Sequence, residues 1–267
     1  MARTIEALIP YPKPENIEPG VLPAFGRFPI VKERMTIEDL RGREDELSLD
    51  REGFVLLRRP SAVKNFRDPE EVKRVYVPEI EVMLKEITGA SKVTTDGGGL
   101  VRLSQRSPEA KSVGVGTGNF VHADYSMNAG PTWVRRALPQ EEAEQRLKKR
   151  YAIYNIWRCY SEPPQDVPLG VCDARSVAPE DVIHCELRLG PPGSGIAFEN
   201  SAYFHNAKHR WCYFSNMTRD DVLIFRGLVS DHNYTSAAPH TAFEDPTCPD
   251  NAPARESIDI RSIVYFD

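Results

Sequence analysis

Six short apolar stretches in the second half of the chain decide the fold: YAIYNIWRCY (151–160), VIHCELRLG (182–190), GIAFEN (195–200), HRWCYFS (209–215), DVLIFRG (221–227) and SIDIRSIVYF (257–266). Runs of this length, separated by Pro, Gly, Asp and Asn, are typical of β-strands. So many strands in succession indicate a sandwich, a jelly roll or a barrel. We therefore expect a mainly β protein with flanking helices.

The first half of the chain contains the helical patterns. Asp68–Gly89 opens with Asp-Pro and repeats apolar residues at helical spacing, and Pro78 should kink this helix. A second helix is expected over Pro139–Arg150, where acidic residues come first and basic residues last. Gly53–Leu57 and a segment around Phe120–Ser126 are expected to contribute strands.

Length and proline content suggest how the chain is organised. A chain of 267 residues is near the upper size for one core, so we expect one domain over residues 1–267. Residues 1–46 are rich in proline and should form an extended arm laid over the body, followed by a short helix starting near Thr36. The catalytic or binding body would then be residues 47–267.

Composition excludes several classes of function. The 34 basic and 39 acidic residues give a net charge of −5 without a basic cluster, which argues against a nucleic-acid partner. No apolar run is long enough to span a membrane and the N-terminus does not resemble a signal peptide, so we expect a cytoplasmic protein without a membrane partner. The five cysteines are widely spaced and should be reduced thiols.

His122 and Asp124 carry the strongest chemical signal. Side chains two positions apart on a strand point to the same face, so an imidazole and a carboxylate would lie side by side. Two histidines and one carboxylate on one face of a metal form the ligand set of non-haem Fe(II) oxygenases. A hydrogen-bonded His–Asp pair without a metal would show the same sequence pattern.

The third ligand is expected from the C-terminal part of the chain. His240 stands fifteen residues before Arg255, which with Ser257 forms an Arg-x-Ser pattern. A guanidinium and a hydroxyl at this spacing can bind a carboxylate, such as the distal carboxylate of 2-oxoglutarate, through hydrogen bonds. His232 is the alternative third ligand, and we favour His240 because it is closer to this pattern. A solvent-facing edge strand would also carry polar residues on one face.

Further candidates lie on the predicted strands. Asn155 and Arg158 could anchor the carboxylate of a cosubstrate, although Arg158 could equally form a buried ion pair, for example with Asp173. His184 is expected to be structural. Ligand sites are mostly apolar with a few polar groups, and on this basis we expect the substrate pocket to be formed by Tyr125, Trp157, His209, Trp211 and Phe243.

Several blocks together resemble a known family. They are LSLDREGFVLL (47–57), ITGA (87–90), VHADYS (121–126), YNIWR (154–158), PLGVCDARSV (168–177), HRWCYFSNMTRDDVLIFRG (209–227), PHTAFEDP (239–246) and ARESIDIR (254–261). In order and spacing they are similar to the AsaB/CmcJ-like hydroxylase/desaturase family, from about residue 47 to the C-terminus. The chain departs from the family pattern at Gly97–Gly99, where a histidine is frequent, and at Tyr125, where glutamine is frequent.

The resemblance implies a double-stranded β-helix of the jelly-roll or cupin type that binds Fe(II) and 2-oxoglutarate. His122, Asp124 and His240 would be the iron ligands and Arg255 the anchor of the cosubstrate. The expected reaction is hydroxylation, desaturation or oxidative cyclisation of a small molecule of secondary metabolism, with dioxygen as the other partner. A non-catalytic accessory protein of the same fold and a metal-dependent hydrolase are the alternatives, and a homodimer or a partner biosynthetic enzyme is compatible with the sequence.

Overall fold

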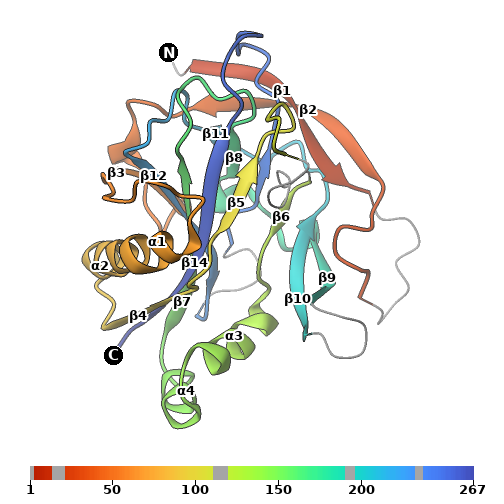
Figure 1. Cartoon of the computed structure of the whole chain (residues 1–267). Coiled ribbons are helices and arrows are strands. Elements are labelled where there is room, and N and C mark those ends of the chain that lie inside the picture. Colours follow the sequence, from red (N-terminus) through yellow and green to blue (C-terminus); the bar gives the residue numbers. More distant parts are fainter. Residues whose placement is uncertain (1–2, 14–21, 111–119, 190–195, 232–236) are drawn as a thin grey trace.

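Two β-sheets face each other in the computed structural model, which describes residues 3–13, 22–110, 120–189, 196–231 and 237–267 (Figure 1). The eight-stranded sheet has the order β1 (Arg3–Pro12), β2 (Ile30–Asp39), β11 (Trp211–Tyr213), β8 (Leu169–Cys172), β13 (His240–Ala242), β6 (His122–Ala123), β10 (Ile196–Tyr203), β9 (Val182–Leu189). The six-stranded sheet has the order β3 (Phe54–Arg58), β12 (Asp221–Val229), β7 (Tyr151–Cys159), β14 (Glu256–Tyr265), β4 (Lys92–Thr95), and β5 (Leu100–Leu103) also pairs with β14. The mainly β architecture expected from the sequence is confirmed.

The core between the sheets follows from the two-residue period of the strands. Trp157 and Cys159 on β7 pack in one cluster with Val171 on β8 and Cys212 on β11, which belong to the opposite sheet. The intervening residues of β7 point the other way, and Ile156 packs against the helices. All nine residues of β7 are buried, because both faces of this central strand are covered.

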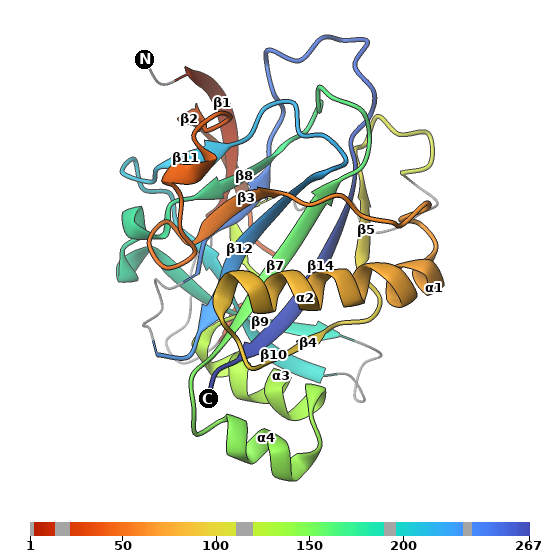
Figure 2. The same cartoon turned by 90° about the vertical axis from the view of Figure 1, so that its left-hand side faces the viewer.

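Helices α1 (Pro69–Glu71) and α2 (Val77–Thr88) cover the outer face of the six-stranded sheet (Figure 2). The carboxylate of Asp68 accepts hydrogen bonds from the first free N–H groups of α1, and Gly89 ends α2 with a φ of 69°. The kink expected at Pro78 takes the form of a π-helical segment, Val72–Tyr76, directly before α2. The other helical segments are η1 (Glu44–Glu46), η3 (Met127–Ala129), α3 (Gly130–Ala137), α4 (Gln140–Arg146), η4 (Ala174–Ser176) and η5 (Pro179–Asp181).

The secondary structure of the N-terminal segment differs from the one expected from the sequence. β1 and β2 form a ten-residue antiparallel hairpin, and Thr36 lies inside β2 instead of starting a helix. Exposed and buried side chains alternate from Thr4 to Ile9, and this strand pattern outweighs the proline content here. Pro10 and Pro12 are tolerated because β1 is an edge strand. The division of the chain at residue 46 into an arm and a body stays a prediction.

The hairpin nevertheless lies over the body, as expected. β2 pairs with β11 over only three residues, and the N–H of Val121 donates to the carbonyl oxygen of Pro10 at 2.8 Å. Apolar residues of β1 and β2 form one cluster with Trp211 of β11, which points away from the six-stranded sheet. The hairpin therefore covers the outer face of the eight-stranded sheet. No helix among the described residues is long and apolar enough to cross a bilayer.

Candidate functional site

Strands β6 and β13 bring the two predicted histidine ligands together. His122 pairs directly with His240 in the antiparallel register, and their ring centroids are 4.4 Å apart. Asp124 follows β6 immediately, because this strand is only two residues long and not the longer strand expected around 120–126. One possible ligand atom from each of the three residues lies within 4.8 Å of the others. In the part of the chain that is described, this is the one such group of metal-binding residues.

The two imidazoles are held in the state that a metal ligand needs. The Nδ1–H of His122 donates to the carbonyl oxygen of Phe120 at 2.8 Å, so Nε2 keeps its lone pair and faces Oδ1 of Asp124 at 3.8 Å. Burial lowers the pKa of His122, and burial with the neighbouring His122 lowers the pKa of His240 to about 3. Both rings are therefore neutral at physiological pH and can donate to a cation.

Asp124 is oriented by a polar network on its other oxygen. Its Oδ2 accepts hydrogen bonds from Nδ2 of Asn155 at 2.6 Å and from Nε and Nη2 of Arg261 at 3.1 and 3.0 Å. Burial alone would raise the pKa of Asp124, but Arg261 and the two histidines lower it further than burial raises it. Arg261 also binds Asp259, whose pKa is raised by burial. Asp124 is thus ionised, and its Oδ1 faces Nε2 of His122.

Arg255 occupies the same cavity as the two histidines. The cavity is small, with a volume of about 20 Å³, and its walls include His122, His240, Trp157 and Asp259. Arg255 is 1% exposed and its guanidinium lies 5.6 Å from the ring of Trp157. Its Nε and Nη2 have no hydrogen-bond partner among the described residues. Burial lowers the pKa of Arg255 to about 10, so the group stays cationic at neutral pH.

The two unsatisfied guanidinium nitrogens of Arg255 in this cavity fit a bound anion. A buried charge without a counter-ion is costly, and such orphaned donors usually mark a ligand or water site. A carboxylate of a bound keto acid fits this donor set, because a guanidinium binds a carboxylate through two parallel hydrogen bonds. The residues present therefore fit both a divalent iron and 2-oxoglutarate.

The remaining predicted cosubstrate residues have different positions. Ser257 lies between Arg255 and Asp259 along one face of β14, and its hydroxyl donates to the carbonyl oxygen of Arg102 at 3.3 Å. Asn155 contacts Asp124 through its amide nitrogen.

The structure contradicts the cosubstrate role predicted for Arg158, because its side chain points to the outer face of the six-stranded sheet. Its guanidinium donates to the hydroxyl of Tyr76 and to the carbonyl oxygens of Arg59 and Arg219. It is neither near the cluster nor paired with Asp173.

Three predicted pocket residues also lie elsewhere. Trp211 is on β11 but faces the hairpin, where its Nε1 donates to the hydroxyl of Tyr11 at 2.8 Å. His209 bonds the same hydroxyl and the carboxylate of Asp181. Phe243 follows β13 and packs in the hairpin cluster. Trp211 and Phe243 pack on the side of the eight-stranded sheet that the hairpin covers, and His209 bonds Tyr11 of that hairpin.

Tyr125 and Trp157 do lie at the site. Trp157 is a wall of the Arg255 cavity. Tyr125 lines a separate cavity next to Asp124, and Gly97 lines it too, so both departures from the family pattern border one space. His184 bonds Glu199 at 2.8 Å, away from the cluster. His232, the alternative third ligand, lies outside the described residues.

Arg261, Asp259 and Trp133 are site residues that sequence reasoning did not assign. The sequence does carry a signal for Arg261 and Asp259, because they alternate with apolar residues along β14, which Arg255 directly precedes. Trp133 lies on a short helix and has no such signal.

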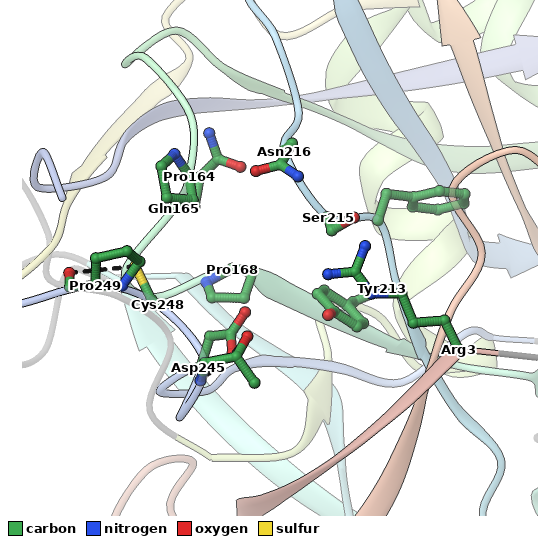
Figure 3. A pocket seen from close by; sticks show the side chains of 12 residues that line it. Arg3, Pro164, Gln165, Pro168, Tyr213, Ser215, Asn216, Asp245, Cys248 and Pro249 are labelled. Atoms are coloured by element: carbon green, nitrogen blue, oxygen red, sulfur yellow. Dashed lines mark hydrogen bonds between the residues drawn. The ribbon is translucent and has the colours of Figure 1, made fainter.

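Figure 3 shows another hollow of the molecule, which shares no lining residue with the cluster. Arg3, Tyr213, Asp245 and Cys248 are among its walls, and the thiol of Cys248 donates a hydrogen bond to the carbonyl oxygen of Pro249. This hollow is therefore separate from the candidate metal centre.

Comparison with known proteins agrees with this geometry. A family model described as "Oxidoreductase/YMDC permease-like domain" matches residues 18–265. The chain is 32% identical to the hydroxylase/desaturase CTB9 of Cercospora beticola over 86% of this chain and 76% of that protein. It is 30% identical to the alpha-ketoglutarate-dependent dioxygenase phiK of a fungal species, over 98% of this chain and 96% of that protein.

A solved structure shares the fold. The iron and alpha-ketoglutarate-dependent endoperoxidase NvfI superimposes with a TM-score of 0.85 at 24% identity, covering 98% of each chain. The enzyme class and the cofactors expected from the sequence, iron(II) and 2-oxoglutarate, are confirmed by these relatives together with the His-Asp-His cluster. The chain therefore belongs to the hydroxylase/desaturase family of iron(II)- and 2-oxoglutarate-dependent dioxygenases.

Proposed function

We propose that His122, Asp124 and His240 hold the iron(II) of this dioxygenase on one side and leave its other positions open. Two histidines and one carboxylate on one face are the ligand set of non-haem iron oxygenases. The pairing of β6 with β13 places both histidines on the inner face of one sheet. The two facing sheets would then form the double-stranded β-helix expected from the sequence, with the metal between them.

The observation that carries this proposal is the position of Arg255. Its unsatisfied guanidinium shares a cavity with His122 and His240, so a molecule that reaches the histidines can also reach the arginine. We infer that Arg255 binds the far carboxylate of 2-oxoglutarate. Trp157 and Phe225 form apolar walls of the same space and keep water away from it.

Iron(II) with 2-oxoglutarate and dioxygen supplies the oxidising chemistry that removes a hydrogen atom from the substrate. The protein contributes orientation and electrostatics. Asn155 and Arg261 hold Oδ2 of Asp124, which restricts this carboxylate to one ligand oxygen. The neutral imidazoles of His122 and His240 add no charge of their own, so the cluster presents one negative charge to the cation.

The substrate is a small molecule of secondary metabolism, and the reaction is a hydroxylation, a desaturation or an oxidative cyclisation. Relatives named hydroxylase/desaturase and dioxygenase support this range. A cytoplasmic location, a homodimer and a partner biosynthetic enzyme stay predictions from the sequence.

An anaerobic titration of the apo-protein, first with Fe(II) and then with 2-oxoglutarate, tests the proposed residue roles. We expect a weak visible charge-transfer band when the keto acid chelates the iron. His240→Ala should abolish iron binding, whereas His232→Ala should keep it. Arg255→Met should keep iron binding. It should weaken the binding of the keto acid by about tenfold or more, as expected for loss of a charge-assisted hydrogen bond.

The controls separate the alternatives. Arg188→Met removes an exposed arginine whose side chain bonds Glu186, and should leave both titrations unchanged. Iron binding that survives His240→Ala but not His232→Ala would reverse the assignment of the third ligand. A protein that binds iron but not the keto acid would favour a hydrolase, and one that binds no iron would favour an accessory protein.

A further inference from the structure

We propose that the cavity beside Asp124 binds the substrate, and that this substrate is an apolar, ring-bearing molecule with a carboxylate at one edge. The cavity has a volume of about 390 Å³ and is partly open to solvent. Tyr125, Trp133, Arg136, Ile153, Arg261 and Ile263 are among its walls. This inference rests on the proposed function and adds the substrate class to it.

The position of this cavity follows from the inner face of β14. Arg255 lines the cavity with the histidines, Arg261 binds Asp124, and Ile263 lines the cavity beside Asp124. Since a strand rises about 3.3 Å per residue, Arg255 and Ile263 are roughly 26 Å apart. The metal cluster therefore lies between the cosubstrate anchor at one end and this cavity at the other.

Two walls connect the cavity to the metal centre directly. Tyr125 is the next residue after Asp124, and Arg261 donates two hydrogen bonds to the carboxylate of Asp124. A molecule in the cavity would contact both. The cosubstrate and the substrate would then approach the metal from opposite sides, which keeps the second site free when the first is filled.

Aromatic and aliphatic side chains define the body of the substrate. The ring of Trp133 packs edge-on against Tyr125 and Phe198, with centroid distances of 5.6 and 4.9 Å. Ile153 and Ile263 supply aliphatic surface from two neighbouring strands. Rigid aromatic walls of this kind favour flat or ring-bearing molecules over extended polar chains.

Polar groups define the edge of the substrate. The indole Nε1–H of Trp133 is buried and has no acceptor among the described residues, although an indole N–H can only donate. Arg136 lies over the same ring at 5.7 Å and forms no ion pair with the described part of the chain, unlike Arg135, which bonds Glu144. An unmet donor and an unpaired cation beside one ring match the two oxygens of a carboxylate.

Asp96 adds a second polar feature. It lines the same cavity, and a carboxylate offers only acceptor oxygens. It can therefore accept a hydrogen bond from a hydroxyl group on the substrate, whereas it would repel a second carboxylate. The expected substrate thus has one acidic edge, next to Arg136, and not two.

The test uses 2-naphthoate as a probe and 2-naphthylmethanol as its neutral counterpart. Both are titrated by NMR into protein loaded with Zn(II) and saturating 2-oxoglutarate, so that the probe cannot occupy the Arg255 site. We expect saturable binding of the acid, and Arg136→Met should raise its dissociation constant by about tenfold, the lower range for a charge-assisted hydrogen bond. In the same variant, the dissociation constant of the neutral alcohol should rise by less than about twofold.

Arg135→Met is the matched control, because the neighbouring arginine has the same charge but bonds Glu144 on the surface. It should leave both probes unchanged. Equal loss in the two variants, or no loss in Arg136→Met, would overturn the inference. Absence of saturable naphthoate binding would also overturn it, and if the iron–keto acid band still forms in the same preparation, the proposed function survives that result.

Discussion

Arg261→Met should weaken both the fold and the metal centre, because one guanidinium serves two buried carboxylates. Arg261 donates two hydrogen bonds to Asp124 and one to Asp259, at 3.0 to 3.1 Å. Its side chain is 17% exposed, and those of Asp124 and Asp259 are 14% and 6% exposed. The substitution keeps the aliphatic stem and removes only the charge.

The magnitude follows from the charges that are left behind. Removing one partner of a buried ion pair costs about 3–5 kcal/mol, since the other partner stays buried without compensation. At about 2–4 °C per kcal/mol for a chain of this size, the melting temperature of the apo-protein should fall by about 6–20 °C. Loss of a residue that orients a metal ligand typically lowers metal affinity by about 10- to 100-fold.

Thermal denaturation and an anaerobic Fe(II) titration measure the two effects separately. Asp259→Asn in the Arg261→Met background should recover part of the stability, because it removes one unpaired carboxylate, but it should not restore iron affinity. Arg261→Lys should fall between the wild type and Arg261→Met, since a lysine cannot form the two-nitrogen contact with Asp124. An Arg261→Met protein with unchanged melting temperature and iron affinity would refute the role of the network.

Three further substitutions probe other parts of the structure. Gly227→Ala would place a Cβ 3.1 Å from Oδ1 of Asn155 and displace that amide from Asp124. Iron affinity, measured by titration, should therefore fall by about tenfold. Burial holds the pKa of His209 below its usual value, so the unfolded chain binds a proton that the folded protein does not, and stability falls as pH drops below about 6.5. His209→Gln should flatten this dependence in melting curves between pH 5.5 and 7.5. Leu84→Ala, at a fully buried position, should cost about 2–5 kcal/mol in urea denaturation without changing iron affinity.

The sequence predicted the elements whose signal is local. Asp68, Gly89 and the apolar period between them predicted the long helix, and the strands of the second half appear at the expected positions. The spacing of His122 and Asp124 predicted that the two side chains lie side by side, and the structure brings them together with His240. These predictions depended on side-chain periodicity and on ligand chemistry, and both can be read from one chain.

The failures concern the choice of face. His209, Trp211 and Phe243 have the residue types of a ligand pocket, but they cover the outer side of the eight-stranded sheet, where the N-terminal hairpin packs. Because that hairpin is far away in sequence, nothing near these residues indicated a second buried layer. Arg158 was misplaced for the same reason, since α2 buries the outer face of β7 as fully as the opposite sheet buries its inner face.

Residues along β14 border both the Arg255 cavity and the cavity beside Asp124. Its outward residues Ile258 and Ile260 pack under α2, so the strand cannot shift without breaking the core. Arg255 directly precedes the strand, and the inward residues follow at fixed intervals, from Asp259 and Arg261 beside Asp124 to Ile263 in the open cavity. Since the strand sets the spacing between these side chains, the backbone fixes the distance from the proposed cosubstrate anchor to the proposed substrate cavity. Substitutions in the cavity should therefore change substrate preference while iron and 2-oxoglutarate binding persist.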